Sequence, residues 1–440
     1  MLTVSFAALP LATPAARRSQ PPGPDVSLLD LIELEIGHTT LADRYYQHID
    51  PQRLLDGARS GIVAYLHGRG IASPAVAYLH ARPDGRGSVP AIEQQIGKAI
   101  ERYGRRVNAR ELVYGAIRGE LAALHDPYSM FFTKAQLKGF STALDGETFG
   151  GIGVVLANDE ATHRWRIDQI FDDGPAARAG VRSGDEIAAV DGQPVGDIAT
   201  ASVRLRGKTG TSVSLSIVRD AVPLADAIVI TRALVSPPNV VSRLLPGGIG
   251  YVALRAFDAQ AGTELRTALG KLDAQGARAT IFDLRGNGGG YESASVHVAS
   301  LFVARGPIVS IQENHGKRRI TNADGNALAP RPLVVLVNHD SASGSELVTA
   351  AIEDHRAGTT VGTQTYGKGL VQSVFPLPDG SALKVTTARY FTPDGHDIDR
   401  VGITPDIVVD EPSGSRAGVP GSDPQLDRAI TIVARETAAH

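Results

Sequence analysis

Short apolar runs alternate with longer amphipathic stretches in the second half of this 440-residue chain. A short run rich in β-branched residues and bounded by turn residues predicts a buried strand, whereas apolar residues at helical spacing predict a helix. On this basis we predict strands over Gly250–Arg255, Ala279–Leu284 and Leu333–Val337, and helices over Thr263–Leu272 and Glu292–Phe302. This alternation, which extends from Ile249 to about Val409, is typical of an α/β core.

A serine stands between the last of these strands and the next helix. Pro332 and Asn338 bound the strand, and Glu346–Glu353 predicts the helix, so Ser343 is expected in the turn between them. Backbone N–H groups at a helix N-terminus favour negative charge. Such a turn can therefore expose a nucleophile and stabilise an oxyanion beside it.

A serine hydroxyl needs a base, and Lys368 is the better candidate in this sequence. His339 and His355 are not obviously placed for a Ser-His-Asp relay, whereas Gly367 and Gly369 would let the backbone at Lys368 pack closely against another element. A lysine base must be neutral, so burial must lower its pKa from about 10.4 to roughly 7–8.

The strand predicted over Gly369–Phe375 would place Lys368, Leu370 and Gln372 on one face of the sheet. Gln372 could then hydrogen-bond the lysine nitrogen and hold it towards Ser343.

Asp283–Gly290 (DLRGNGGG) is a strand that breaks into a glycine-rich loop. A phosphate-binding loop is excluded because no Gly-Lys-Ser/Thr ends it. We expect an oxyanion hole instead, formed by the backbone N–H groups of Gly289 and Gly344. Asp283 and Arg285 are expected to brace the loop. Chemistry alone leaves Ser341 and Ser345 open as alternative nucleophiles.

The N-terminal half contains an internal repeat. Ile49–His67 aligns with Val107–His125, and both copies carry small and apolar residues at helical spacing, which suits tight helix–helix contact. Two copies cannot form a solenoid, so we predict a helical cap whose second copy lies nearer the catalytic unit. The histidines that end the copies, His67 and His125, favour compensation of the helix dipole over catalysis.

From about Phe140 to Arg219 the pattern changes to short strands and turns, and over roughly 80 residues it resembles a PDZ domain of the bacterial protease type. The resemblance implies that the backbone N–H groups of Gly150, Gly151, Ile152 and Gly153 bind the terminal carboxylate of a peptide. The peptide itself would add as a strand to an open sheet edge, with Arg206 as a candidate contact.

The composition of the chain excludes several classes of function. The chain has 42% hydrophobic and 21% charged residues, a net charge of -3 and no cysteine. It is therefore an ordinary globular protein without disulfides, thiol nucleophiles or thiolate metal sites, and its charge predicts no binding to nucleic acid. The first 18 residues are either part of a secretory signal that lacks its basic start or an Ala/Pro-rich tail.

Together these motifs resemble the carboxyl-terminal processing peptidases, or tail-specific proteases, over about Leu112 to Asp406. The resemblance implies Ser343 as nucleophile, Lys368 as base 25 residues later, and Gln372 as the orienting residue. The motifs concerned are HDPYS (125–129), the PDZ run, DLRGNGGG, SASGSE (341–346), YGKGLVQ (366–372), YFTPDG (390–395) and GITPD (402–406). The chain departs from the family pattern at Gly344 (usually alanine), at Gly288 (commonly proline) and in HDPYS for LDPHS.

The expected fold is a multidomain α/β protein with a helical N-terminal cap, an α+β PDZ domain and an α/β core like that of crotonases and ClpP. The expected regions are a signal-like segment and linker (1–25), the helical region (26–135), the PDZ domain (136–225), the protease core (226–410) and a C-terminal tail or helix (411–440).

The expected function is that of an exported, periplasmic or envelope-associated serine endopeptidase. It would recognise protein C-termini, with an adaptor protein as a candidate partner, and would need no metal or organic cofactor. A catalytically idle PDZ scaffold and a crotonase-like acyl-CoA enzyme remain the alternatives.

Overall fold

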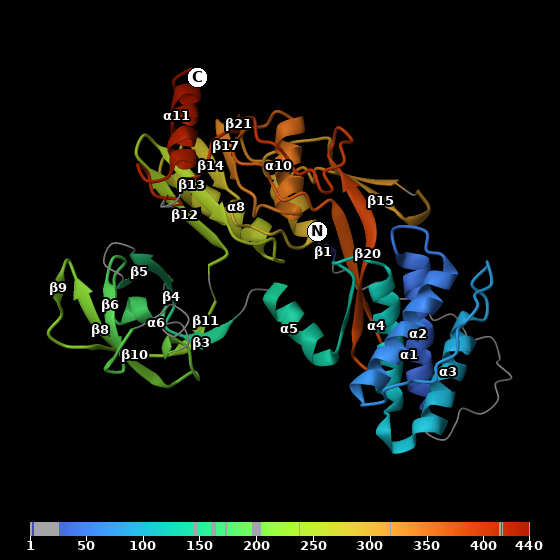
Figure 1. Cartoon of the computed structure of the whole chain (residues 1–440). Coiled ribbons are helices and arrows are strands. Elements are labelled where there is room, and N and C mark those ends of the chain that lie inside the picture. The colour runs from blue at the N-terminus through green and yellow to red at the C-terminus, as the bar shows by residue number, and fades with distance from the viewer. Residues whose placement is uncertain are drawn as a thin grey trace. The chain divides into compact units, whose positions relative to one another are not determined.

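The protein, described here by a computed structural model, comprises two compact units (Figure 1). One contains Met1–Gly139 and Val240–His440, and the other contains Phe140–Asn239. The structure describes residues 2–3, 26–144, 148–159, 164–171, 174–195, 204–236, 238–316, 318–412, 415 and 417–439. Most of the signal-like segment expected over residues 1–25 lies outside these ranges.

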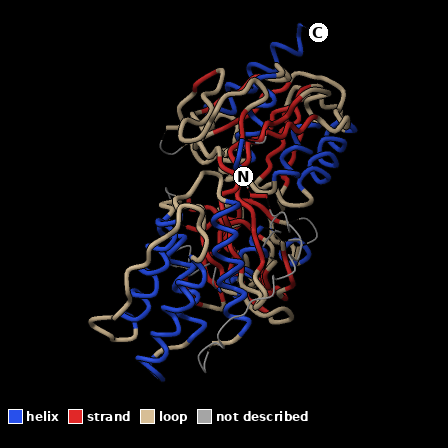
Figure 2. The backbone as a smooth tube through the Cα atoms, turned by 90° about the vertical axis from the view of Figure 1, so that its right-hand side faces the viewer, coloured by secondary structure: helices blue, strands red, loops and turns tan. Residues whose placement is uncertain are grey.

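The helical region of the first unit is a bundle whose helices run side by side (Figures 1 and 2). Its core is built from leucine and isoleucine side chains of all four helices, among them Leu34, Leu54, Ile92 and Leu112. Side-chain caps fix the helix starts, as when Asn108 accepts the backbone N–H of Glu111 at 3.1 Å. The elements are α1 (Leu28–Arg44), α2 (Pro51–Gly68), α3 (Ser88–Tyr103), the 3-10 turn η1 (Gly104–Arg106) and α4 (Ala109–Ala123).

The two copies of the repeat form α2 and α4, and the predicted tight contact is confirmed. A Cβ atom on Gly57 would lie 2.6 Å from the carbonyl oxygen of Gly119, and one on Gly61 would overlap the carbonyl oxygen of Gly115. Glycine is therefore required because the two backbones touch. His67 lies in the last turn of α2, and His125 lies two residues beyond α4.

The α/β part is built on a six-stranded sheet that agrees with the strands predicted from the sequence. Its order is β12-β13-β14-β17-β18-β21, parallel except for β12. β14 and β17 are buried at every residue, as expected for central parallel strands covered on both faces. The strands are β12 (Val240–Leu245), β13 (Ile249–Leu254), β14 (Ala279–Asp283), β17 (Leu333–Val337), β18 (Thr359–Gly362) and β21 (Ile407–Val408).

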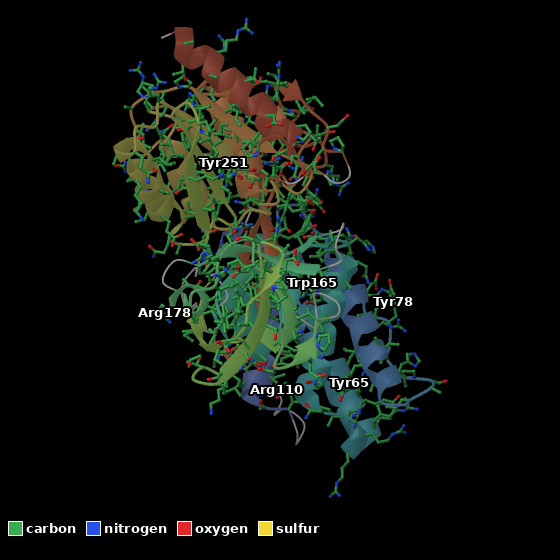
Figure 3. The ribbon with its side chains drawn as sticks, turned by 90° about the vertical axis from the view of Figure 1, so that its left-hand side faces the viewer. Tyr65, Tyr78, Arg110, Trp165, Arg178 and Tyr251 are labelled. Carbon is green, nitrogen blue, oxygen red and sulfur yellow. The ribbon has the colours of Figure 1, made fainter. Side chains whose placement is uncertain are left out.

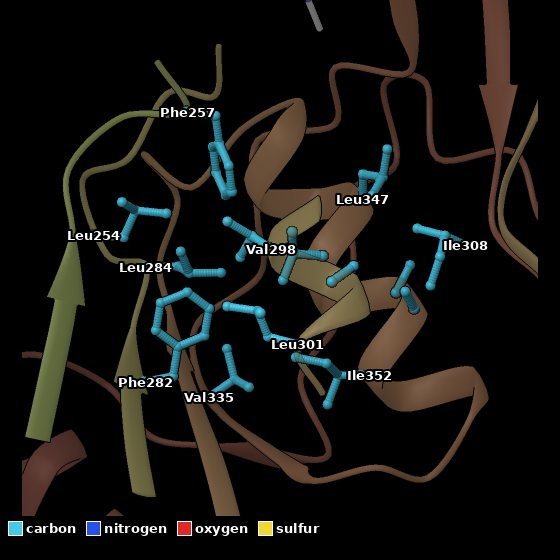
Figure 4. Close-up of a cluster of buried hydrophobic side chains, with 14 of the residues drawn as sticks. Leu254, Phe257, Phe282, Leu284, Val298, Leu301, Ile308, Val335, Leu347 and Ile352 are labelled. Carbon is cyan, nitrogen blue, oxygen red and sulfur yellow. The ribbon is translucent and has the colours of Figure 1, made fainter. Parts of the chain in front are cut away.

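Alternate strand residues face two different cores. Phe282 and Val335 pack against Val298 of α9 and residues of α10 on one face (Figure 4). The same cluster includes Leu265 of α8. Ile281 and the neighbouring strand residues pack against α11 on the other face. These helices are α8 (Ala261–Ala274), α9 (Glu292–Ser300), α10 (Gly344–Asp354) and α11 (Pro424–Ala439).

A second sheet joins the helical bundle to the α/β part. Its order is β1-β19-β20-β15-β16, with β2 paired to β20, so the chain that leaves α4 adds a strand to this sheet. This arrangement places α4, the second repeat copy, next to the sheet whose strand β19 begins just after Lys368. The strands are β1 (Leu2–Thr3), β2 (Met130–Phe132), β15 (Pro307–Glu313), β16 (Arg318–Asn322), β19 (Leu370–Pro376) and β20 (Ala382–Phe391), and the 3-10 turn η2 (Asn314–Gly316) joins β15 to β16.

The second unit is a small β-rich domain with its own core, which includes Ile152, Ile167 and Leu215. The main sheet has the order β10-β8-β6-β5-β4, so β4 lies at its edge, and a separate pair is formed by β3 and β11. The elements are β3 (Phe149–Gly151), β4 (Val154–Asp159), β5 (Arg164–Ile170), α6 (Pro175–Arg178), β6 (Glu186–Val190), β7 (Gln193–Pro194), β8 (Ser212–Arg219), β9 (Val222–Pro223), β10 (Ile228–Thr231) and β11 (Ala233–Val235). The helix α5 (Lys134–Leu144) spans the boundary between the units.

Within the described residues, we find no helix that combines the length and the apolar character needed to cross a membrane.

Candidate active site

Two loops meet where the neighbouring parallel strands β14 and β17 end. Leu284–Gly290 follows β14, and Asn338–Ser343 follows β17 and leads into α10. Because the carboxyl ends of parallel strands lie at one sheet edge, this is the usual place for a site in an α/β fold. The carbonyl oxygen of Asn287 joins the loops by accepting the N–H of Ala342 at 3.0 Å and the hydroxyl of Ser345 at 2.7 Å.

Ser343 occupies a strained turn at the start of α10. Its φ of 59° and ψ of -109° are unusual for a residue with a Cβ atom, and such strain gathers at functional sites. Its hydroxyl is buried and has no hydrogen-bond partner among the described residues. By contrast, Ser341 donates to the carbonyl oxygen of Leu284 at 2.9 Å, and Ser345 is bound to Asn287. Of the three serines, only Ser343 has a hydroxyl without a structural partner in the described part of the chain.

Gly289 lies directly beside Ser343. A Cβ atom built on it would come 2.8 Å from the Cβ of Ser343 and 2.9 Å from the backbone nitrogen of Gly344. The N–H group of Gly289 donates to the Asn287 side chain at 2.9 Å. The two proposed oxyanion donors therefore flank the serine, but one of them is already hydrogen-bonded.

The loop that carries Lys368 is packed against the segment that contains the GITPD motif. A Cβ atom on Gly367 would lie 2.9 Å from the backbone nitrogens of Val401 and Gly402, and one on Gly369 would lie 2.7 Å from that of Asp399. The predicted close packing on both sides of Lys368 is thus confirmed. Burial lowers the pKa of Lys368 below its ordinary value, although the carboxylates of Glu346 and Asp126 oppose that shift.

Glu346 connects the serine turn to the lysine loop. Its fully buried carboxylate accepts four hydrogen bonds: one oxygen binds the backbone N–H of Ser343 at 2.7 Å and of Lys368 at 2.9 Å, and the other binds the N–H of Gly367 and the hydroxyl of Thr365, both at 2.6 Å. The backbones of Ser343 and Lys368 are therefore held together by one oxygen atom.

The HDPYS motif lies on the same side of the second sheet as Gln372. Gln372 is fully buried and its amide nitrogen lies 3.5 Å from the hydroxyl of Thr386, which donates to Asp126 at 2.6 Å. The amide oxygen of Gln372 has no hydrogen-bond partner among the described residues. Ser129 donates to the same Asp126 oxygen at 2.6 Å. The pairing of β19 with β20 shifts between Val371, which pairs with Ala388, and Gln372, which pairs with Thr386.

Two tyrosines lie close to Lys368 and Ser343. The ammonium group of Lys368 lies 5.0 Å from the centre of the Tyr128 ring. The hydroxyl of Tyr390, from the YFTPDG motif, donates to the carbonyl oxygen of Ser343 at 3.0 Å. Burial raises the pKa of Tyr390 well above its ordinary value, so this hydroxyl stays protonated and remains a donor.

The residues that we expected to have structural roles have them. Arg285 forms ion pairs with Asp283 at 2.6 Å and with Asp423 at 2.7 Å, and Tyr251 (labelled in Figure 3) donates its hydroxyl to Asp283. This network ties the glycine-rich loop to the start of α11. His355 binds the carbonyl oxygen of Pro307 at 2.7 Å, away from the serine turn.

In the second unit, Gly150 and Gly151 belong to β3, where they pair with Leu234 and Ala233 of β11, and Ile152 and Gly153 connect β3 to the edge strand β4. The carbonyl oxygen of Gly150 accepts the N–H of Gly207, and that of Ile152 accepts the N–H of Ala176. The guanidinium of Arg206 lies 4.1 Å from the centre of the Phe149 ring, so Arg206 is close to this loop.

The sequence analysis missed Glu346, Asn287 and Lys384, which is buried on β20. The Glu346 contact was available from the pattern Ser343-x-x-Glu346, a capping box in which the third helical residue binds the cap backbone. Asn287 and Lys384 gave no such signal, because their partners are distant in sequence.

Comparison with known proteins identifies the family. The profile of Peptidase family S41 matches residues 248–409, and that of the PDZ domain matches residues 166–219. A carboxyl-terminal-processing protease of Synechocystis sp. is 36% identical over 341 residues, which is 76% of this chain and 80% of the relative. The chain belongs to the carboxyl-terminal processing peptidases of family S41.

Other members of this family agree with that assignment. A carboxy-terminal-processing protease of Bartonella bacilliformis is 35% identical over 73% of the chain and 77% of its own length. The solved structure of a photosystem II D1 C-terminal processing protease matches with a TM-score of 0.50 and 28% identity, covering 94% of this chain and 99% of that one. The protein is thus an S41 serine peptidase with a PDZ domain, and its relatives include bacterial and chloroplast enzymes.

Proposed function

We propose that this S41 peptidase cleaves protein substrates through an acyl-enzyme formed on Ser343, with Lys368 as the base. The observation that carries the proposal is the unpartnered, buried hydroxyl of Ser343 on a strained turn whose backbone shares one Glu346 oxygen with the backbone of Lys368. A nucleophile held ready beside its base is the arrangement that covalent catalysis requires.

In the proposed reaction, neutral Lys368 takes the hydroxyl proton of Ser343 as the serine oxygen attacks the scissile carbonyl carbon. The resulting ammonium gives that proton to the leaving amine, and the C–N bond breaks to leave an ester on Ser343. Lys368 then deprotonates water, which hydrolyses the ester and restores the serine. Gln372, buried beside Thr386, is proposed to orient the lysine.

The oxyanion would be stabilised by the N–H groups of Gly344 and Gly289. The Gly344 amide stands in the first turn of α10, where the helix dipole favours negative charge. The Gly289 amide donates to Asn287 in the free protein, so it must release or share that bond when the oxyanion forms.

The PDZ domain is proposed to bind the free C-terminus of the substrate, with Gly150, Gly151, Ile152 and Gly153 facing the carboxylate. The support is topological: this loop leads directly into β4, the edge strand of the domain sheet, to which a peptide can add. Arg206 is a further candidate for that contact. An adaptor protein could deliver substrates, and we propose an exported, periplasmic or envelope location.

The main alternative within the family is a PDZ protein that binds C-termini without cleaving them, and a crotonase-like acyl-CoA reaction is the second. The matched set of Ser343, Lys368 and Gln372 argues against both, because neither use requires all three.

Substituting single residues tests the assignment. Ser343→Ala and Lys368→Ala should each abolish cleavage of an unfolded protein substrate while the circular dichroism spectrum stays that of the wild type, because the pair acts as one unit. The matched controls are Ser341→Ala and Ser345→Ala, which remove hydroxyl groups from the same triplet. Loss of cleavage in a control, with activity retained in Ser343→Ala, would show that the nucleophile is misassigned.

A further inference from the structure

Ser295 of α9 lies beside Gly344, the first residue of α10. The two helices pack against each other, and Ser295 is fully buried. Its hydroxyl donates to the carbonyl oxygen of Tyr291, one turn earlier in the chain, at 3.0 Å. Serine commonly forms this bond inside a helix. The bond fixes the direction of the Ser295 hydroxyl within the packed space between α9 and α10.

That hydroxyl fills the space beside the Cα atom of Gly344. A Cβ atom built on Gly344 would lie 2.3 Å from the Oγ of Ser295 and 3.1 Å from the Cδ2 atom of Phe257. The first distance is a severe overlap, and the Phe257 ring is itself fully buried (Figure 4). Residue 344 must therefore be glycine while residue 295 is serine. This gives a physical reason for the departure from alanine at Gly344.

The same neighbours hold the other proposed oxyanion donor. The backbone N–H of Phe257 donates to the carbonyl oxygen of Gly289 at 3.0 Å, and the carbonyl oxygen of Phe257 accepts the N–H of Tyr291 at 2.7 Å. Tyr291 in turn accepts the hydroxyl of Ser295. One continuous set of contacts therefore places the backbones of Gly289 and Gly344. Such placement matters because a shift of about 1 Å in a positioning group can cost about 100-fold in rate.

We propose that Ser295 is a positioning residue of the oxyanion hole, whose buried hydroxyl packs against Gly344 and holds its N–H group towards the developing oxyanion. Ser295 acts through the backbone of Gly344 and does not touch the substrate. The inference rests on the proposed function, in which the Gly344 amide stabilises the oxyanion formed when Ser343 attacks.

The test exchanges the hydroxyl for the methyl group that it excludes. With unfolded casein as substrate, Gly344→Ala should lower kcat about 100-fold and change KM by less than about twofold, because the methyl group displaces the amide from the oxyanion. Ser295→Ala leaves a gap beside Gly344 and should lower kcat about three- to tenfold. In the double variant the new methyl group fills that gap, so kcat should return to within about threefold of the wild type.

Restoration by the second substitution distinguishes positioning from general damage, because the effects of two independent substitutions add. Ser300→Ala is the matched control. Ser300 is also a fully buried serine of α9, its hydroxyl donates to the carbonyl oxygen of Val296 at 2.7 Å, and it accepts the N–H of Asp324. Ser300→Ala should keep the wild-type kcat and should not restore Gly344→Ala.

Circular dichroism and urea unfolding show which variants are folded. If Gly344→Ala does not fold, the double variant decides the question, since it should fold and cleave. The inference is wrong if either single variant cleaves as fast as the wild type, or if the double variant cleaves no faster than Gly344→Ala. Failure of the proposed function looks different, since Ser343→Ala would then still cleave.

Discussion

The crossing of α2 and α4 offers a prediction whose size can be worked from the structure. Gly61→Ala should destabilise the helical bundle, because the new methyl group overlaps the carbonyl oxygen of Gly115 and lies 2.9 Å from the Cα of Gly119. Both obstacles are backbone atoms, which cannot rotate away as a flexible side chain could. The helices must therefore separate.

The net effect is the difference between two terms. Forcing extra volume into a packed contact costs about 1–3 kcal/mol, and more when the backbone must move. Alanine gains about 1 kcal/mol over glycine inside a helix. Because both obstacles are backbone atoms, the cost lies at the upper end of the first range, about 3 kcal/mol, and we expect Gly61→Ala to lose about 2 kcal/mol overall. Gly115→Ala should lose less, because its methyl group would meet the nearest atom, the carbonyl oxygen of Gly61, at 3.1 Å.

Gly97 of α3 is the matched control. It also lies inside a helix, but a Cβ atom there meets nothing within 4 Å, so Gly97→Ala should stabilise its helix by about 0.5–1 kcal/mol. The same chemical change thus has opposite signs at two sites of one bundle. Because a two-unit protein need not unfold in one step, hydrogen exchange of the α2 and α4 amides is the suitable assay.

We expect amide protection to be strongest in Gly97→Ala, weaker in the wild type, weaker still in Gly115→Ala and weakest in Gly61→Ala. If Gly61→Ala protects the amides of α2 and α4 as well as Gly97→Ala does, the backbones do not touch as described and the reasoning is wrong. The bundle matters for the site as well, since α4 leads into the segment that carries Asp126.

Three further predictions concern charge and recognition. Burial raises the pKa of Glu33 to about 7, from 4.5 in the unfolded chain, so its stabilising contribution is complete below pH 4.5 and is lost as the pH rises through 7. At pH 8, Glu33→Gln should therefore unfold at a higher urea concentration than the wild type, with a free energy of unfolding that is larger by up to about 3 kcal/mol. At pH 4 the two proteins should differ little. Equal unfolding curves at both pH values would contradict this prediction. Thr365→Val removes one of the four donors to Glu346 and should lower kcat about tenfold with KM little changed, whereas Thr363→Val, two residues earlier in the same loop, should act as wild type. Amidating the C-terminus of a substrate should raise its KM, and an unchanged KM would argue against recognition of the carboxylate by the PDZ domain.

Elements with a local signature could be predicted from the sequence. The strand β17 and the helices α8, α9 and α10 were expected within a few residues of their observed bounds, because apolar periodicity records which face is buried. The role of the glycines beside Lys368 was also expected. Gln372 shows the limit of such reasoning: alternation along a strand predicts the face on which its side chain lies, but the residue that it meets there, Thr386 of β20, is distant in sequence.

What could not be predicted is the electrostatic setting of the site, because it is assembled from distant segments. Asp126 follows α4, Glu346 belongs to α10 and Lys384 lies on β20, yet both carboxylates act on Lys368, and Asp126 and Lys368 act on Lys384. Each residue looks ordinary in its own segment: an acidic residue in a turn, a cap, and a charged strand position. Only the folded structure lets these charges act together on the protonation of the buried lysines, because burial removes the water that would otherwise screen them. The pH at which Lys368 becomes neutral is therefore a property of the assembled sheet rather than of the YGKGLVQ motif.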